Sequence, residues 1–298
     1  MPSLRSLSSF ASGLLSQVPL LSQSRQPFSI SSPQSQSPFP PVNSLQAGVG
    51  VSNFEHTCPI NSPTSCHNST AFPDSCCFIY PGGQLLQTQF WDTGPSIGPS
   101  DSWTLHGLWP DLCDGSYPTF CTQAPMYHNI TAILSSASSS LSTSNNEPSL
   151  LEYMKTYWLP NRGSPDSFWE HEWNKHGTCV NTLAPGCYSS YTPGSEVVDY
   201  FTRAVALFKE LDTYKALAAK GIVPVWGKTY TRAEILDALK AVTGQDVVIG
   251  CRGRVINQAW YSFNVKGSLQ GGEFIATEPV GKSGRGGCPE RGIRYLPK

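Results

Sequence analysis

The sequence has no long hydrophobic run and no excess of charge of either sign. None of its apolar stretches reaches the roughly 18 to 20 residues that a membrane-spanning helix requires, which excludes an integral membrane protein. Lys and Arg number 20 against 21 Asp and Glu, so the chain lacks the strong positive charge of a histone-like nucleic-acid binder. An anionic ligand must therefore be held by a local group of side chains.

Common metal and nucleophile motifs are also missing. No C-x-x-C pair occurs, which disfavours zinc ribbons and thioredoxin-type redox sites, and no G-x-S-x-G occurs, which removes the nucleophile elbow of serine hydrolases. His171 and Glu172 resemble the start of the HExxH zinc motif, but position 175 is Lys. His176 is rotated by about 140° from His171 on a helix. The sequence therefore predicts neither a metal nor another cofactor.

Cysteine is abundant, and its number is even. With no metal motif present, the cysteines predict a framework of disulfides, with many pairings left open and with adjacent Cys76 and Cys77 bonded to different partners. Thiol catalysis is then not expected. Glycosylation sequons begin at Asn68 and Asn129, and both features are typical of passage through an oxidising secretory compartment. The ten cysteines stand at positions 58, 66, 76, 77, 113, 121, 179, 187, 251 and 288.

The N-terminal segment differs in composition from the rest. It is rich in Ser and Pro, and its only charged residues before Glu55 are Arg5 and Arg25. We expect residues 1–20 to be a signal peptide and residues 21–56 to be a Ser/Pro-rich propeptide or spacer. An acid-free start with Arg and Ser also fits an organelle transit peptide. Secretion is the favoured destination, with a vacuole or lysosome-like acidic compartment as the alternative.

Residues 57–298 are expected to form a single domain of the α+β class, because helical and strand periodicities are mixed without regular alternation. The Ser-rich stretch 135–149 is expected to be a loop between two short helical pieces. Alternation predicts strands over 84–91, 103–109, 247–249, 259–265 and 274–276. Helical spacing and capping boxes predict helices over 167–177, 196–219 and 231–242.

Two segments concentrate the reactive side chains. WTLHGLWPD (103–111) and FWEHEWNKHGTC (168–179) hold three of the six histidines and four of the eight tryptophans. In the first segment, strict strand alternation predicts that His106 faces one side of the sheet, while Gly107 and Trp109 face the other.

The second segment is predicted to be a helix that begins at Ser167 and ends at Gly177. Ser167 and Glu170 have the spacing of a capping box. On a helix, four side chains of this segment share one face: Phe168, Glu172, Lys175 and His176. His171 lies on the flank of that face. One interpretation is that these are core aromatics with polar edges at the surface. The other is a catalytic site.

The histidines, glutamate and lysine of these two segments fit the cleavage of RNA by its own 2′-hydroxyl. This reaction needs neither a metal nor a protein nucleophile. The attacking oxygen is already tethered beside the phosphorus, so proton transfer and charge stabilisation remain to be supplied. A neutral histidine takes the 2′-OH proton while a protonated histidine donates to the leaving 5′-oxygen. Two histidines near the usual pKa of about 6.5 hold both states together, which predicts a bell-shaped pH profile on the mildly acidic side.

Both segments resemble the active-site segments of the ribonuclease T2 family, and the resemblance covers roughly residues 57–298, including Cys76-Cys77. It is closest to the extracellular fungal members. It implies an α+β fold in which a central antiparallel sheet, flanked by helices, presents its histidine to the helix. It also implies five disulfides, Cys58–Cys77, Cys66–Cys113, Cys76–Cys187, Cys121–Cys179 and Cys251–Cys288.

The resemblance also implies roles for individual residues. His176 is the expected base and His106 the expected acid of the first step, and these roles reverse in the hydrolytic second step. The catalytic residues are His106, Glu172 and His176, and the phosphate-contacting pair is His171 and Lys175. The primary base site consists of Trp109, Asp111 and Tyr117, and the secondary base site of Gln89 and Phe168.

The implied function is endoribonucleolytic cleavage of single-stranded RNA with low base specificity, through a 2′,3′-cyclic phosphate to 3′-phosphate ends. No cofactor, metal, membrane or obligate protein partner is expected, and the chain is expected to be a monomer. The alternative is a binding or cytotoxic protein that uses the same scaffold without catalysis. The basic residues after position 281 are interpreted as a solvated tail.

Overall fold

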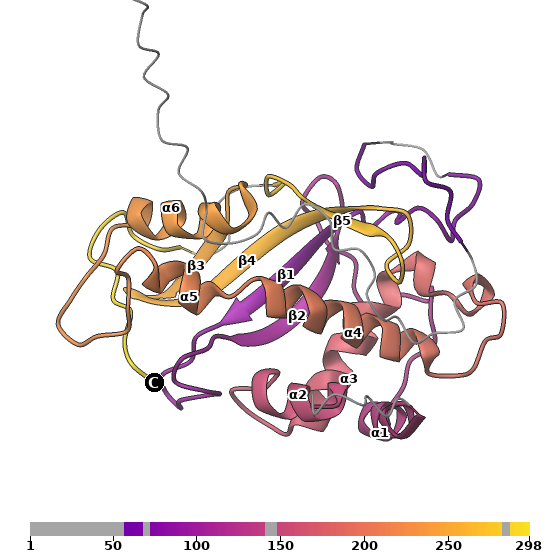
Figure 1. Ribbon diagram of the computed structural model, residues 1–298, viewed down its shortest axis with the longest axis horizontal. Coiled ribbons are helices and arrows are strands. Elements are labelled where there is room, and N and C mark those ends of the chain that lie inside the picture. Colours follow the sequence, from indigo (N-terminus) through magenta and orange to yellow (C-terminus); the bar gives the residue numbers. More distant parts are fainter. Residues whose placement is uncertain (1–56, 68–71, 141–147, 282–286) are drawn as a thin grey trace, which may run out of the picture. The chain divides into compact units, whose positions relative to one another are not determined.

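The computed structural model describes residues 57–67, 72–140, 148–281 and 287–298 (Figure 1). The expected signal peptide, the spacer up to residue 56 and the sequon at Asn68 lie outside the described residues. The centre of the fold is a five-stranded antiparallel sheet in the order β2-β1-β4-β3, with β5 paired to β4. Its strands are β1 (Gln84–Phe90), β2 (Thr104–Asp111), β3 (Val248–Arg252), β4 (Val255–Lys266) and β5 (Glu273–Ala276). The expected α+β fold with an antiparallel sheet is confirmed.

Six α-helices surround the sheet in the described part of the chain. Figure 1 shows α4 lying along the sheet and α1, α2 and α3 together beside β2. No described helix is long and apolar enough to span a membrane. The helices are α1 (Ile130–Ser140), α2 (Leu150–Tyr157), α3 (Pro165–Lys175), α4 (Ser195–Glu210), α5 (Thr213–Ala218) and α6 (Arg232–Thr243), and three short 3₁₀ turns lie between Gly177 and Cys187.

Two predicted boundaries are wrong. The helix expected over 196–219 is two helices, because the chain leaves α4 at Leu211 and the Asp212 carboxylate accepts the Lys215 N–H to cap α5. The loop expected over 135–149 is helical as far as Ser140, so α1 extends into the Ser-rich stretch.

The start of α3 is also earlier than expected. Ser164, not Ser167, is the N-cap: its hydroxyl accepts the Ser167 N–H at 3.2 Å, and Pro165 occupies the first turn. Glu170 is therefore not part of a capping box and instead contacts His128. The predicted capping box of Thr231 and Glu234 is present at the start of α6.

The predicted disulfide framework is confirmed in all five pairs. Cys121–Cys179 matters most for the site, since Cys179 follows directly after the catalytic helix. Beside it, the Phe120 N–H donates to the Lys175 carbonyl at 3.0 Å. The loop before α1 is thus tied to the end of α3.

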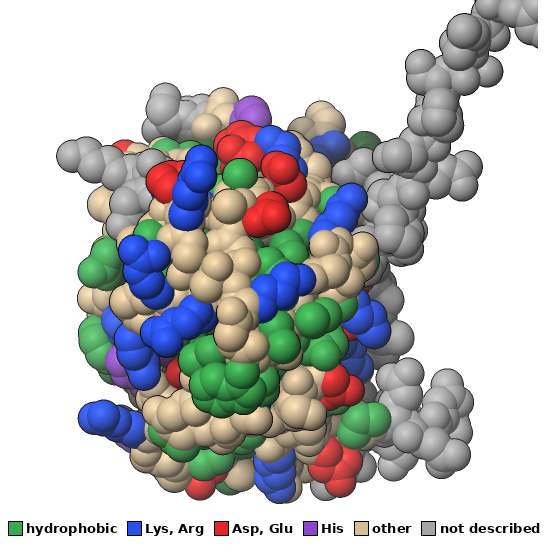
Figure 2. Space-filling model, turned by 90° about the vertical axis from the view of Figure 1, so that its left-hand side faces the viewer, with side chains coloured by type: hydrophobic (Ala, Val, Ile, Leu, Met, Phe, Trp, Pro, Cys, Tyr) green, Lys and Arg blue, Asp and Glu red, His purple; other side chains and the backbone are tan. Residues whose placement is uncertain are grey.

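The C-terminal residue is not part of a solvated tail. The Lys298 ammonium donates to the carbonyls of Pro99 and Ser102 and lies 4.4 Å from the Trp91 ring centre. The interpretation of the basic C-terminal end as solvated is therefore wrong at Lys298. Figure 2 shows a face of the molecule on which Lys and Arg side chains are dispersed among acidic and neutral ones.

Candidate active site

A β-bulge sets the position of His106. On β1, Thr88 pairs with Gly107 and the next residue, Gln89, pairs with Leu105, so His106 is an extra residue on β2. A bulge shifts the alternation of side chains by one position. His106 and Trp109 therefore lie on the same face, with ring centres 5.5 Å apart. The prediction that they face opposite sides is wrong for this reason.

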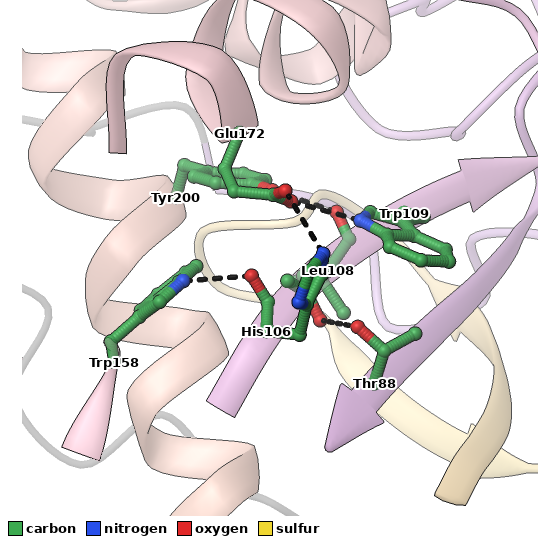
Figure 3. Close-up of polar contacts among 8 residues, drawn as sticks. Thr88, His106, Leu108, Trp109, Trp158, Glu172 and Tyr200 are labelled. Carbon is green, nitrogen blue, oxygen red and sulfur yellow. Dashed lines mark hydrogen bonds and ion pairs between the residues drawn. The ribbon is translucent and has the colours of Figure 1, made fainter. Parts of the chain in front are cut away.

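Three side chains hold the backbone around the bulge (Figure 3). The Trp158 indole donates to the His106 carbonyl at 2.7 Å, and the Tyr200 hydroxyl donates to the Leu108 carbonyl at 2.9 Å. From the neighbouring strand, the Thr88 hydroxyl donates to the Gly107 carbonyl at 3.1 Å. Because β2 is an edge strand, carbonyls on its outer side have no strand partner. Trp158 and Tyr200 supply these partners and fix the strand.

Glu172 on α3 points at this strand and is almost completely buried, with 1% of its surface exposed. Its Oε2 accepts the Trp109 indole N–H at 2.9 Å, and its Oε1 lies 3.6 Å from Nε2 of His106. Gly107 makes this approach possible. A Cβ at position 107 would lie 2.1 Å from Oε2 of Glu172, so a side chain there excludes the carboxyl group from its position.

The two catalytic histidines predicted from the sequence both contact the Trp109 ring, His106 edge-on and His176 stacked. His176 ends α3, donates its backbone N–H to the Glu172 carbonyl, and stacks on Trp109 with 5.1 Å between ring centres. His106 is 27% exposed and is flanked by Phe90, stacked at 4.1 Å, and Phe168, edge-on at 4.9 Å. The fold thus gathers both imidazoles and the buried carboxyl group from segments that are far apart in the chain.

Lys175 adds positive charge at the same place, whereas burial, followed by the charge of Lys175, lowers the pKa of the neighbouring His171. His171 is exposed, and its ring centre lies 6.4 Å from that of His176. Lys175 is half-buried and lies close enough to act on the pKa values of all the catalytic groups. The structure thus brings His171 and Lys175 to the same site as the catalytic groups, and their contact with a phosphate stays a prediction.

Burial dominates the protonation states of the site. Desolvation, followed by the nearby charges of His171 and Lys175, lowers the pKa of His106 and of His176 well below the usual range. Desolvation raises the pKa of Glu172 to about 8, and the Trp109 hydrogen bond and Lys175 oppose this change. Burial therefore favours the uncharged form of all three groups, and the expectation of two histidines near the usual pKa of 6.5 is wrong.

A compact donor set is present despite the wrong HExxH spacing. One ligand atom each from His171, Glu172 and His176 lies within 4.8 Å of the others. His176 is the C-cap of α3, and its ring centre lies 6.4 Å from that of His171. Imidazole and carboxylate donors of this kind suit Zn²⁺ or Cu²⁺. The expectation of a metal-free reaction stays a prediction.

The predicted base-site residues differ in accessibility. Asp111 at the end of β2 is buried, Tyr117 is 58% exposed, and Trp109 and Phe168 are half-buried at the site. Gln89 lies on the opposite face of the sheet, fully buried. Its amide donates to the Leu211 carbonyl and accepts from the Thr213 hydroxyl. Both ends of the Gln89 amide are thus engaged in hydrogen bonds on the face of the sheet away from His106.

Three site residues were not anticipated from the sequence. Phe90 stacks on His106, Trp158 holds the bulge, and Trp260 on β4 meets the Trp109 ring edge-on at 5.8 Å. Each belongs to an aromatic-rich stretch that is equally typical of a core. The bulge decides which side chains face the site, and no pattern in the sequence marks its position. The sequence therefore does not distinguish these three residues from ordinary core residues.

Two imidazoles beside a buried carboxyl group, with a lysine at the same site, define a site for acid–base cleavage of a phosphodiester on an α+β scaffold. Residues 68–276 match the model of the Ribonuclease T2 family. The chain belongs to this family, and it is an endoribonuclease.

Individual relatives agree with this assignment. Ribonuclease Trv of Hypocrea rufa is 53% identical over 242 residues, which cover 81% of this chain and 98% of that protein. Ribonuclease T2 of Aspergillus oryzae is 51% identical and covers 86% of this chain and 90% of its own. Among solved structures, Actibind, described as a T2 ribonuclease and an antitumorigenic agent, is 48% identical with a TM-score of 0.74. That match covers 81% of this chain and 98% of Actibind.

Proposed function

We propose that this protein cleaves single-stranded RNA by transesterification, with low base specificity and without a metal ion. The observation that carries the proposal is that His106 and His176 both contact Trp109, which is hydrogen-bonded to the buried carboxyl group of Glu172. Two proton-transfer groups at one phosphodiester are what this reaction requires. RNA is required as the substrate because its 2′-hydroxyl is the nucleophile.

In the first step, His176 takes the 2′-hydroxyl proton and the 2′-oxygen attacks phosphorus. The bond from phosphorus to the 5′-oxygen breaks, and His106 donates a proton to that oxygen, which leaves a 2′,3′-cyclic phosphate. His106 must be protonated for this step. The negative charge of the bound phosphodiester raises the pKa of an adjacent imidazole, which opposes the effect of burial.

The remaining polar groups stabilise the charge on the pentacoordinate phosphorus. His171 and Lys175 face the non-bridging oxygens, Lys175 as a cation and His171 as a hydrogen-bond donor. Glu172 is protonated in the unliganded site, since burial raises its pKa to about 8, and it can donate a hydrogen bond to one of these oxygens. Donors fixed in a water-poor site stabilise a transition state strongly because they need no reorganisation.

In the second step, water replaces the departed strand and the roles of the histidines reverse. His106 takes a proton from the water, which attacks the cyclic phosphate, and His176 returns a proton to the 2′-oxygen. The product is a 3′-phosphate. The half-buried Trp109 and the exposed Tyr117, together with Asp111, are proposed to bind the base on the 5′ side of the scissile bond, and Phe168 the base that leaves. Gln89 is left out of this site because it is buried elsewhere.

We propose the localisation of the protein from its N-terminal segment, its disulfides and its glycosylation sequons. Residues 1–20 would act as a signal peptide and residues 21–56 as a spacer, followed by secretion of a monomer or delivery to an acidic compartment. Five disulfides support an oxidising route. Asn129 is exposed just before α1 and is accessible to glycosylation, as proposed also for Asn68. Mass spectrometry of the mature N-terminus tests the leader.

The decisive experiment is the replacement of each catalytic histidine. We expect His106→Phe and His176→Phe to lower kcat for a dinucleoside phosphate by about 10²-fold or more each, with thermal unfolding similar to wild type. Wild type should release a 2′,3′-cyclic phosphate first. Retention of cleavage in both variants would contradict the proposal. Retention of a cellular effect without cleavage would favour the non-catalytic binding protein.

A further inference from the structure

Two arginines from distant parts of the chain line one pocket, which short chain segments connect to the residues that flank His106. Arg162 lies in the loop between α2 and α3, and Arg252 is the last residue of β3. Both are exposed. The pocket has a volume of about 330 Å³ and is lined by Gly94, Pro95, Asn161, Arg162 and Arg252. Its position and charge are not used by the mechanism described above.

The pocket is joined to the surroundings of His106 by two short segments. Gly94 lies four residues after Phe90, which stacks on His106. Arg162 lies six residues before Phe168, which meets the same ring edge-on. Four extended residues span at most about 14 Å. Gly94 therefore lies no more than about 14 Å from Phe90, one of the two aromatic residues that flank His106.

Both guanidinium groups are available to an anion. Within the described residues, neither Arg162 nor Arg252 has a hydrogen bond or an ion pair from its side chain. One opposing group is Asp92, whose charge interacts with Arg252 and Lys298. Burial raises the pKa of Asp92 and so favours its uncharged form. A pocket with two unpaired arginines and one buried acid retains net positive charge.

We propose that Arg162 and Arg252 bind the RNA phosphate that follows the leaving nucleotide, one nucleotide to the 3′ side of the scissile bond. The direction rests on the proposed function, in which His106 donates to the 5′-oxygen, so that the leaving strand extends from the His106 side. The planar fork of a guanidinium matches the oxygens of a phosphate and forms charge-assisted hydrogen bonds with them.

This contact is remote from the reacting atoms and is the same in ground state and transition state. It therefore lowers KM for substrates that carry the downstream phosphate and leaves kcat unchanged. It also makes the binding of those substrates more sensitive to salt, since a neutralised phosphate releases counterions.

The test compares three substrates that differ only in one phosphate. They are a dinucleoside monophosphate, the same molecule with a phosphate at its 3′ end, and the same molecule with a phosphate at its 5′ end. We expect wild type to prefer the 3′-phosphorylated substrate by about three- to tenfold in kcat/KM. Arg162→Gln combined with Arg252→Gln should abolish this preference and leave cleavage of the unphosphorylated substrate unchanged. Lys240→Gln on α6, which lies away from α3 in Figure 1, is the matched control and should keep the preference.

Each alternative result is informative. Equal kcat/KM values for the three substrates in wild type overturn the inference. An equal loss of kcat/KM for the 3′- and 5′-phosphorylated substrates in the double variant also overturns it, because such a loss indicates a nonspecific charge effect. A steeper salt dependence of KM for the 3′-phosphorylated substrate in wild type is expected independently of any variant, and its absence also overturns the inference. Failure of wild type to cleave any of the three substrates refutes the proposed function itself.

Discussion

Trp109 donates its indole N–H to Oε2 of Glu172 over 2.9 Å, and this bond joins the edge strand β2 to the catalytic helix α3. It depends on two local features of β2. The bulge at His106 turns Trp109 to the face of the sheet that meets α3, and Gly107 leaves room for the carboxyl group. The relative position of the catalytic groups thus depends on backbone geometry as well as on the residues that react.

Replacement of Gly107 by alanine is expected to disturb catalysis without removing a reactive group. The new Cβ would lie 2.1 Å from Oε2 of Glu172, so the carboxyl group must move away. We expect kcat to fall by about 10²-fold, the size of effect seen when a group is displaced by about 1 Å. The control is Gly186→Ala, where nothing lies within 4 Å of the added atom. Similar kinetics for both variants would contradict the role assigned to Gly107.

Replacement of Trp109 by phenylalanine removes one hydrogen-bond donor and keeps an aromatic ring. Because the Trp109 hydrogen bond lowers the pKa of Glu172 and so opposes burial, its loss should raise that pKa above about 8. The measurement is a pH titration of the Glu172 side-chain carboxyl carbon by NMR in both proteins. A lower pKa in the variant would mean that the indole does not stabilise the carboxylate.

Replacement of Glu172 by glutamine is expected to change how stability depends on pH. The native state keeps a proton on Glu172 up to about pH 8, whereas the unfolded chain releases it near the ordinary value of 4.5. The unfolded state therefore binds fewer protons between these values, and the stability of wild type falls as pH rises through this window. Glutamine cannot ionise, so unfolding temperatures of Glu172→Gln should decline less from pH 4.5 to pH 8. Parallel curves for the two proteins would argue against a raised pKa.

Metal ions should inhibit the enzyme and should not be needed by it. Treatment with EDTA is expected to leave the rate of RNA cleavage unchanged, because imidazoles carry out the proposed proton transfers and no proposed step uses a metal ion. Added Zn²⁺ should inhibit, since ligand atoms of His171, Glu172 and His176 lie within 4.8 Å of one another. His171→Ala removes one ligand and should raise the inhibitory Zn²⁺ concentration. Loss of activity in EDTA, restored by a metal, would contradict the mechanism.

Much of the fold could be predicted because its signals are local. The alternating pattern of 84–91 and the capping box of Thr231 and Glu234 correspond to β1 and α6 in the structure. The division of the helix expected over 196–219 could not be predicted from spacing alone. Apolar positions continue in phase past Leu211, and only the capping of α5 by Asp212 marks the break.

The candidate site shows the same division between local and non-local information. The catalytic histidines and Glu172 could be predicted because they belong to two short segments rich in histidine and tryptophan, 103–111 and 168–179. Few other functions fit these two segments. The position of Gln89 was not found, because a strand pattern does not say which face of a sheet the helices cover. Its amide turns out to bond to the Leu211 carbonyl and Thr213 on the helix side.

Residue types and their spacing were sufficient for the strands, the main helices, the chemistry of the site and, through family resemblance, the cysteine pairs. The folded chain alone brings His106 beside Trp109, lowers the histidine pKa values and groups Arg162 with Arg252. The reason is physical. Periodicity and motifs depend on neighbours along the chain, whereas a bulge, desolvation and a pocket depend on which distant segments come into contact.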